Sequence, residues 1–309
     1  MKKSIYIFVV VALFSACEKI ELTFPPDNQI LAENALQTPE DLQKFLNSCY
    51  DVLANTYNGN CQNLATLQAD DVTAPNSQLD YLEVYNRNTI FFNGTIGGYY
   101  KQPYIAVYRS NYLLENVDLI SEITDEDKNR MTAEARFIRV LCHFDLVRLF
   151  SHPYGYTPDN SHNGIIIKTT TNPDPKPRNS VQEVYDFMIS ELIEVTNLLP
   201  ENNGNYANKY AAHALLAKIY FQTNQLDLAI NETNEVINSG IYELDNDSLF
   251  IHRFREQLSQ EAIFTIVSTS NFDNRSGQFT GSYRSDINAN PTLRASEELF
   301  DLVSIFGDE

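Results

Sequence analysis

The sequence predicts a mostly α-helical fold of tetratricopeptide-like helix pairs, with a loop-rich part between some of the helices. Two observations predict this class. Apolar residues recur at helical spacing in six segments, and the last two segments form a tandem pair with the packing residues of a tetratricopeptide repeat. The chain has 309 residues, 43% of them hydrophobic, so it can bury a large core.

The first helix is expected at residues 39–57. Thr38 is a suitable N-cap, and the carboxylates of Glu40 and Asp41 complement the positive end of the helix dipole. One apolar stripe follows the positions i, i+3, i+4, i+7, i+8 and i+11: Leu42, Phe45, Leu46, Cys49, Tyr50 and Leu53. This stripe predicts that one face of the helix is buried.

Three more helices are predicted from apolar periodicity and capping residues. One is expected at residues 103–120, with Asn111 on its apolar face, where a buried amide needs partners on a neighbouring helix or turn. The next begins after Thr124, a suitable N-cap. The fourth begins at the capping box Ser180-x-x-Glu183.

The tetratricopeptide-like pair is expected at residues 208–223 and 226–239. Two alanines let the helices approach closely, while Tyr220 and Leu226 are expected to fill the groove beside them. Asn224 stands at the turn and tolerates a left-handed backbone conformation. The residues that match the repeat are Leu216, Ala217, Tyr220, Leu226 and Ala229.

The segments between the helices are expected to be loops with two short strands. Residues 79–100 combine six aromatic residues with Asn and Gly. Residues 165–167 and 261–268 are apolar and are predicted strands, whereas residues 271–291 are polar.

The N-terminus has the layout of a secretory signal peptide at residues 1–16. Lys2 and Lys3 precede an apolar run at residues 5–14, which is too short to span a bilayer, because a spanning helix needs about 20 apolar residues. Ser15-Ala16-Cys17 has the pattern of a lipobox, so we expect cleavage before Cys17 and attachment of acyl chains such as palmitate. An ordinary signal peptide with a chance cysteine is the alternative.

A lipidated tether is expected at residues 17–28, followed by the helical domain at residues 29–309. The tether is polar and contains Pro25-Pro26, which favours extended chain. The net charge of −19 argues against nucleic acid as a partner, since phosphates require lysine and arginine. It also argues against direct binding to anionic lipid, so the lipid anchor is the expected attachment to the membrane.

Cysteine and histidine spacing predicts no metal site, because no C-x-x-C pair exists and the five histidines lie far from any cysteine cluster. Cys49 and Cys61 could pair in an oxidising compartment, but free and mostly buried thiols are the favoured interpretation. The sequence lacks the G-x-S-x-G, H-E-x-x-H and Gly-rich phosphate motifs, so neither an enzyme nor a cofactor is predicted.

Five segments, taken in order, carry a family resemblance. They are Leu46-Asn47-x-x-Tyr50-x-x-Leu53, Tyr100-x-x-x-Tyr104-x-x-x-Tyr108-x-x-Asn111-x-Leu113-Leu114-Glu115, residues 134–150, Pro177-Arg178-Asn179-Ser180-Val181 with Tyr185, and residues 211–220. Together, and after a lipobox, they resemble the SusD/RagB family of starch-binding-associated, nutrient-binding lipoproteins of the outer membrane. Tyr100 stands where many members have Trp.

The resemblance implies a SusD-like α–α superhelix beside a loop-rich ligand-binding part. It implies a cell-surface location in the outer membrane and a SusC-like TonB-dependent transporter as partner, with a glycan or oligosaccharide as the ligand. Family members are typically longer than this chain, so we expect a fragment that is incomplete at its C-terminus.

The candidate ligand-binding residues lie near the aromatic-rich segment. Aromatic rings pack on the flat C–H faces of pyranose rings, while Asn, Asp and Arg bond the hydroxyl groups. The candidates are Asp71, Tyr81, Tyr85, Asn86, Arg87, Tyr99 and Tyr100. Core packing is the alternative for the tyrosines, above all for Tyr100 and Tyr104, which lie on the helical pattern.

Three other interpretations concern function. A glycosidase would need two facing carboxylates, whereas the acidic residues here mostly lie on solvated helix faces. A peptide-binding family member or a protein-interaction scaffold is the second alternative. An anion site could form from one charged cluster, although pairs within a single helix are favoured: Arg136, Arg139, Asp145 and Arg148.

Overall fold

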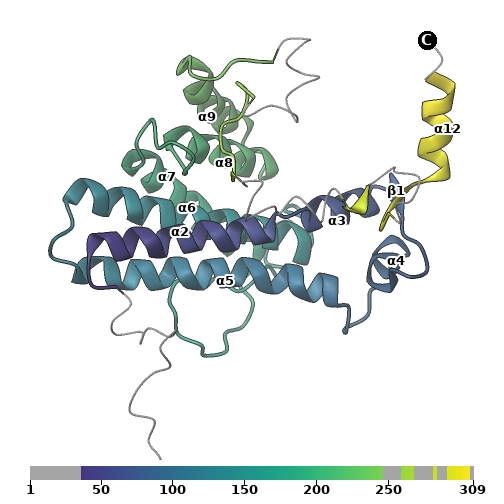
Figure 1. The fold of residues 1–309 in the computed structure, drawn as a ribbon, viewed down its shortest axis with the longest axis horizontal. Helices are drawn as coiled ribbons and strands as arrows, with labels where there is room; N and C mark the ends of the chain where they lie inside the picture. Colours follow the sequence, from purple (N-terminus) through teal and green to yellow (C-terminus); the bar gives the residue numbers. More distant parts are fainter. Residues whose placement is uncertain (1–35, 246–258, 268–280, 284–290, 307–309) are drawn as a thin grey trace, which may run out of the picture. The chain divides into compact units, whose positions relative to one another are not determined.

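The computed structural model describes residues 36–245, 259–267, 281–283 and 291–306 (Figure 1). The chain divides into two units, Met1–Gln37 and Thr38–Glu309, and every helix and strand named below belongs to the second unit. The predicted signal peptide, Cys17 and the tether lie outside the described residues.

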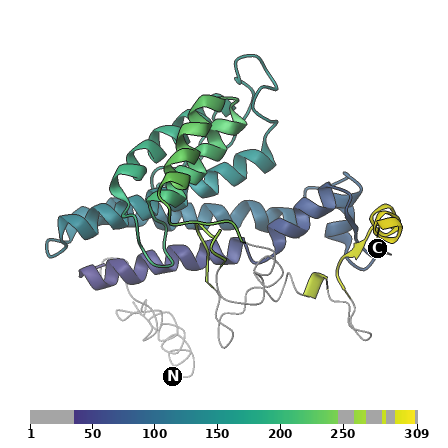
Figure 2. The same cartoon turned by 90° about the horizontal axis from the view of Figure 1, so that it is seen from above.

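The described elements are mostly helices, as the sequence predicts. In chain order they are α2 (Pro39–Thr56), α3 (Asn60–Gln68), β1 (Val72–Thr73), α4 (Leu79–Tyr85), α5 (Gly94–Asn116), the 3-10 helix η2 (Val117–Leu119), α6 (Asp125–Phe150), α7 (Val181–Leu198), α8 (Lys209–Gln222), α9 (Leu226–Asn238), β2 (Arg294–Ala295) and α12 (Glu297–Phe306). Helices α2, α5 and α6 lie side by side, and α7, α8 and α9 follow, each packed against the one before (Figures 1 and 2).

The main core forms where these helices meet. The apolar stripe of α2 is buried as predicted, with Leu42, Leu46 and Leu53 fully removed from solvent. Leu146 of α6 and Leu192 of α7 are equally buried. Each such leucine contributes about 1.5–3 kcal/mol relative to an exposed side chain, so the stripe accounts for the position of α2.

Capping residues fix the predicted helix starts. Thr38 Oγ1 accepts from Asp41 N at 3.2 Å while the Asp41 carboxylate accepts from Thr38 N at 3.1 Å. Ser180 and Glu183 form the same reciprocal pair at the start of α7. Thr124 accepts from Asp127 N and caps α6. These local bonds confirm all three starts.

The predicted start of the second helix is wrong, because α5 begins at Gly94 and contains Pro103 in its interior. Asn93 supplies the cap that the sequence reading missed, since its side chain accepts from Ile96 N at 2.9 Å. Pro103 removes one backbone hydrogen bond, and burial of Tyr99 and Val107 on the same helix stabilises the continuation. Asn111 is fully buried and bonded, as predicted.

Residues 79–100 contain more helix than predicted, and both predicted strands are wrong. Residues 79–85 form α4, and α5 covers the end of the segment. Residues 165–167 are extended but form no strand, because their backbone makes single bonds to Asn179 and to the Tyr104 hydroxyl and pairs with no second strand among the described residues. Residues 261–267 form no strand, and Ser268 lies outside the described residues. The short strands β1 and β2 pair antiparallel instead.

Helices α8 and α9 form the predicted pair and pack closely. Tyr220 and Ala229 are buried, and Asn224 adopts the predicted left-handed conformation with φ of 58°. Leu226 does not fill the groove as expected. It is the first residue of α9 and remains 48% exposed, whereas Ala229, three residues on, is buried.

The described cysteines are free thiols, as favoured from the sequence. Cys49 and Cys142 are fully buried, and Cys61 is partly buried. Burial raises the pKa of the Cys49 thiol to about 12. Because the thiolate is the reactive form, these side chains act as small apolar core residues.

Candidate ligand-binding site

The α4–α5 loop, residues 86–93, carries the two most exposed phenylalanine rings of the described residues. Phe91 is 94% exposed and Phe92 is 85% exposed. Their ring centroids lie 5.2 Å apart in an edge-to-face arrangement. Two neighbouring apolar rings held in water form a surface that is available for stacking by a ligand.

Acidic side chains of α4 hold this loop in place. The Glu83 carboxylate accepts from Asn93 Nδ2 at 2.8 Å and from Ile90 N at 3.3 Å. The Asp80 carboxylate accepts from Thr95 N at 2.8 Å. These bonds fix the loop on either side of the two phenylalanines.

Arg87 and Asp70 form an ion pair beside the loop. Both residues have a left-handed backbone conformation, with φ of 52° and 64°. Arg87 Nη1 lies 2.8 Å from Asp70 Oδ1, and Arg87 Nη2 donates to Gln68 O at 2.8 Å. Because both side chains are at least half exposed, the pair contributes only about 0–1 kcal/mol. Asn86 follows α4 and is exposed, so it offers an amide at the same edge.

Tyr81 and Tyr99 lie in the core beneath the loop. They are 7% and 3% exposed and belong to an apolar cluster formed by α3, α4, β1 and the start of α5. The Tyr81 hydroxyl donates to Asn60 Oδ1 at 3.2 Å. Tyr85 is partly buried against the same cluster. The structure thus places these tyrosines where they support the loop.

Asp71 lies apart from the loop, at a hollow of about 640 Å³ beside β1 and β2. Its side chain is exposed, and its carbonyl accepts from Ser296 N at 3.0 Å. Tyr283 and Arg294 also line this hollow. Asp71 therefore reaches solvent from the strand pair and not from the α4–α5 loop.

Tyr100 lies further along α5. Its ring centroid is 5.2 Å from that of Tyr104 and 4.9 Å from that of Phe150. It is only partly buried, so it is neither a core residue nor a fully exposed one. Of the seven candidates, Asn86 and Arg87 are the ones that are exposed in the α4–α5 loop, which also carries Phe91 and Phe92.

Sequence reasoning missed Phe91 and Phe92 as individual candidates. A usable signal was present, because two consecutive phenylalanines stand between polar residues and the Asn93-Gly94 helix start. In extended chain, successive side chains point to opposite faces, so two adjacent phenylalanines are not expected to face one core together. Their succession in a polar loop could have indicated exposure.

The charged cluster of α6 pairs mainly with another helix. Arg136 Nη2 lies 2.9 Å from Glu191 of α7, and Arg139 also contacts that carboxylate. The expectation of pairs within one helix is wrong for these two arginines, because α7 presents its acidic side chain across the helix interface. It is confirmed for Arg148, which pairs with Asp145 at 3.4 Å.

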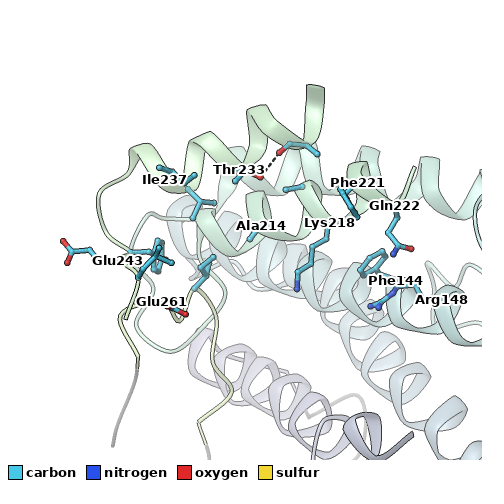
Figure 3. A pocket seen from close by; sticks show the side chains of 16 residues that line it. Phe144, Arg148, Ala214, Lys218, Phe221, Gln222, Thr233, Ile237, Glu243 and Glu261 are labelled. Carbon is cyan, nitrogen blue, oxygen red and sulfur yellow. Dashed lines mark hydrogen bonds between the residues drawn. The ribbon is translucent and has the colours of Figure 1, made fainter. Parts of the chain in front are cut away.

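An apolar groove lies against α8 and α9, which we call the α8–α9 groove. Its volume is about 890 Å³. Figure 3 shows Phe221 and Lys218 of α8, Ile237 and Thr233 of α9, and Phe144 and Arg148 of α6 around it. Phe221 and Ile237 are 68% and 63% exposed. Such walls suit an apolar side chain better than a hydroxyl-rich ligand.

Two searches bear on other kinds of site. Within the described ranges, no group of three or more His, Cys, Asp or Glu residues is placed to hold a metal ion. Among the helices of those ranges, none combines the length and the apolarity that crossing a membrane requires.

Comparison with known proteins identifies the family to which this helical scaffold belongs. Residues 22–221 match the SusD-like family model described as "Starch-binding associating with outer membrane", so the chain belongs to the SusD-like family. SusD-like protein P25 of Formosa agariphila is 24% identical over 276 residues, which is 85% of this chain and 50% of that protein.

Solved structures agree on the fold. A SusD superfamily protein from Bacteroides thetaiotaomicron gives a TM-score of 0.77 at 23% identity, over 87% of this chain and 62% of that one. A laminarin-binding SusD-like protein gives a TM-score of 0.70 at 18% identity, over 88% of this chain and 65% of that one. The chain spans about half the length of the curated relatives it matches.

Proposed function

We propose that this protein is a cell-surface lipoprotein that captures glycans and passes them to a SusC-like TonB-dependent transporter without altering them. The exposed Phe91–Phe92 pair on a bonded loop is the observation that carries this proposal. Membership in a family described as starch-binding and outer-membrane-associated supports it, and so does the laminarin-binding structural neighbour.

The chemistry of the α4–α5 loop suits a saccharide. A pyranose ring exposes a flat face of C–H groups that packs on an aromatic ring, and its hydroxyls require hydrogen-bond partners. Phe91 and Phe92 offer the apolar surface. The exposed amide of Asn86 offers a donor and an acceptor in the same loop. A neutral ligand also fits the net charge of −19, which repels polyanions.

Replacing both phenylalanines tests the proposal. The double variant Phe91→Ala with Phe92→Ala is expected to weaken oligosaccharide binding at least tenfold, because two stacking rings are lost, each worth about 1 kcal/mol. Calorimetric titration with oligosaccharides of starch, laminarin and xylan measures the effect. Phe221→Ala is the matched control, because Phe221 is also exposed but lies in the α8–α9 groove. Equal affinities for wild type and the double variant would contradict the proposal.

The lipid anchor is tested at Cys17. We expect the full-length protein to incorporate labelled palmitate and to fractionate with the outer membrane, whereas Cys17→Ser incorporates none and leaves the membrane. The reason is that acyl chains on this residue supply the membrane affinity that an acidic surface lacks. Cys61→Ser is the control thiol. Labelling that persists in the Cys17→Ser variant would rule out this anchor.

Two further measurements test whether the protein binds oligosaccharides without hydrolysing them and associates with a transporter. Incubation with the bound oligosaccharide should yield no new reducing ends, and co-purification from the native membrane should recover a TonB-dependent transporter.

A peptide is the second candidate ligand, favoured by the apolar walls of the α8–α9 groove, since helical repeats bind peptides in such grooves. Binding of a peptide mixture that Phe221→Ala abolishes would favour that candidate.

A further inference from the structure

Three tyrosines form a row on α5, away from the α4–α5 loop. Tyr100, Tyr104 and Tyr108 are four residues apart, so they lie on one side of the helix. The first two are partly buried, and Tyr108 is 52% exposed. Two hollows of about 330 and 320 Å³ share these three rings, one beside Lys101 and Ile105 and the other beside residues 166–173.

The second hollow has a polar wall that is tied to α5. This wall, the 166–173 segment, lies along the outer side of α5 (Figure 1). The Tyr104 hydroxyl donates to Ile166 O at 2.9 Å, and Asn111 Nδ2 donates to Lys168 O at 3.1 Å and to Thr170 O at 3.2 Å. The Glu115 carboxylate accepts from Thr171 N at 2.8 Å and from its hydroxyl at 2.7 Å. One helix therefore holds the segment along its length.

A second helix fixes the same wall. Arg139 of α6 donates to Asn111 Oδ1 at 2.8 Å, which orients that amide so that its nitrogen faces the segment. His143 Nδ1 donates to Arg139 O at 2.7 Å, so its Nε2 is free of a proton and accepts from Lys168 N at 3.3 Å. Burial lowers the pKa of His143 to about 4, which keeps this acceptor neutral. The wall is thus held before any ligand binds.

The lining favours one class of ligand. The three tyrosines line the hollow from α5, and Lys168, Thr170 and Asn172 line it from the 166–173 segment. Lys168 Nζ donates to Asn172 O and Asp174 O, so two of its N–H donors are already engaged within the segment. Aromatic rings together with hydroxyl and amide groups suit a polyhydroxylated ring.

We propose that the tyrosine row and the 166–173 segment form a second saccharide-binding site, separate from the α4–α5 loop. A sugar ring stacks on Tyr108, and its hydroxyls bond the Thr170 and Asn172 side chains. Residues four apart on a helix rise by about 6 Å, a step comparable to one sugar unit, so Tyr104 and Tyr108 accommodate consecutive units of an oligosaccharide. The site rests on the proposed function only in requiring a saccharide ligand.

The absence of tryptophan from the sequence provides a direct probe of each site. Tyr108→Trp places a single indole in the second site and retains a stacking ring, while Phe92→Trp places one in the α4–α5 loop. Titrating each full-length variant with starch, laminarin and xylan oligosaccharides is expected to shift the emission of both indoles. The Phe91→Ala change, added to Tyr108→Trp, should leave the Tyr108→Trp signal intact.

The loss variant is Tyr108→Ala, which is expected to lower affinity at the second site about tenfold and to reduce the measured stoichiometry. Its fold is preserved because Tyr108 is half exposed, and thermal unfolding checks this. If Phe92→Trp responds while Tyr108→Trp stays silent, the second site is rejected and the proposed function stands. If neither indole responds to any oligosaccharide, the second site and the proposed function are both rejected. A response of Tyr108→Trp to peptides alone also rejects the second site.

Discussion

Replacing Glu191 with alanine is expected to lower the free energy of unfolding by about 3–5 kcal/mol. Glu191 of α7 is 13% exposed and lies between Arg136 and Arg139 of α6, whose side chains are 15% and 7% exposed. Removing the carboxylate leaves the largely buried Arg139 without its counter-charge, and Arg136 keeps only the exposed carboxylate of Glu194. Urea unfolding of wild type and variant, followed by circular dichroism, measures the difference.

A neighbouring acid supplies the matched control. Glu194 lies 2.6 Å from the same Arg136 but is 63% exposed, so Glu194→Ala should change the free energy of unfolding by no more than about 1 kcal/mol. Solvent screening makes the difference between the two acids. Similar losses for Glu191→Ala and Glu194→Ala would show that burial does not decide the strength of this network.

The contribution of Glu191 depends on pH in a defined direction. Burial raises the pKa of Glu191, but the hydrogen bonds and charges of Arg136 and Arg139 outweigh it, so the net pKa lies below the ordinary value of 4.5. The ionised form therefore stabilises the fold fully above that value, and the contribution is lost as pH falls through the lower folded pKa. The difference in unfolding free energy between wild type and Glu191→Gln should become smaller when unfolding is measured below about pH 4.

Replacing Glu134 with alanine is the second large expected effect, again about 3–5 kcal/mol of unfolding free energy. The Glu134 side chain is fully buried in α6. Its carboxylate accepts from the Tyr50 hydroxyl of α2 at 2.6 Å and from Arg130 Nη1 at 2.8 Å. The Tyr50 hydroxyl in turn accepts from Ala207 N at 3.0 Å. One carboxylate thus joins α2, α6 and the segment before α8.

Two variants separate the parts of this network in urea unfolding. Asp127→Asn is the control, because Asp127 pairs with the same Arg130 at 3.0 Å but is 49% exposed. This variant should lower the free energy of unfolding by less than about 1 kcal/mol. Tyr50→Phe removes the hydroxyl and leaves Ala207 N buried without its acceptor, at a cost of about 1–3 kcal/mol. In the double variant Tyr50→Phe with Glu134→Gln, the loss of unfolding free energy should be smaller than the sum of the losses in the two single variants. Strict additivity would mean that the two groups act independently.

Helices with local start signals were predictable from the sequence. Thr38 and Ser180 cap their helices through bonds to residues three positions on, so nothing distant is needed to recognise them. The start of α5 was not predictable in this way, because Pro103 suggested a beginning and the true cap, Asn93, is held by Glu83 and Asp80 of α4. Contacts between elements decided that boundary.

The candidate site shows the same division. Composition correctly marked residues 79–100 as rich in aromatic and amide groups, and the family resemblance agreed with the match to residues 22–221. Composition could not tell which rings face solvent. Tyr99 is 3% exposed while Phe91 is 94% exposed, although both are aromatic residues of one short segment. Packing against α3 and β1 made the distinction.

The sequence by itself determined the helical class, most of the predicted helix starts and the family, because each can be recognised from short segments of neighbouring residues. Tertiary structure alone decided that Glu191 pairs with arginines from another helix, that β1 joins β2, and that the 166–173 segment lies against the tyrosines of α5. These contacts join residues far apart in the chain. Their free energy comes from burial and pairing that exist only after the helices have packed.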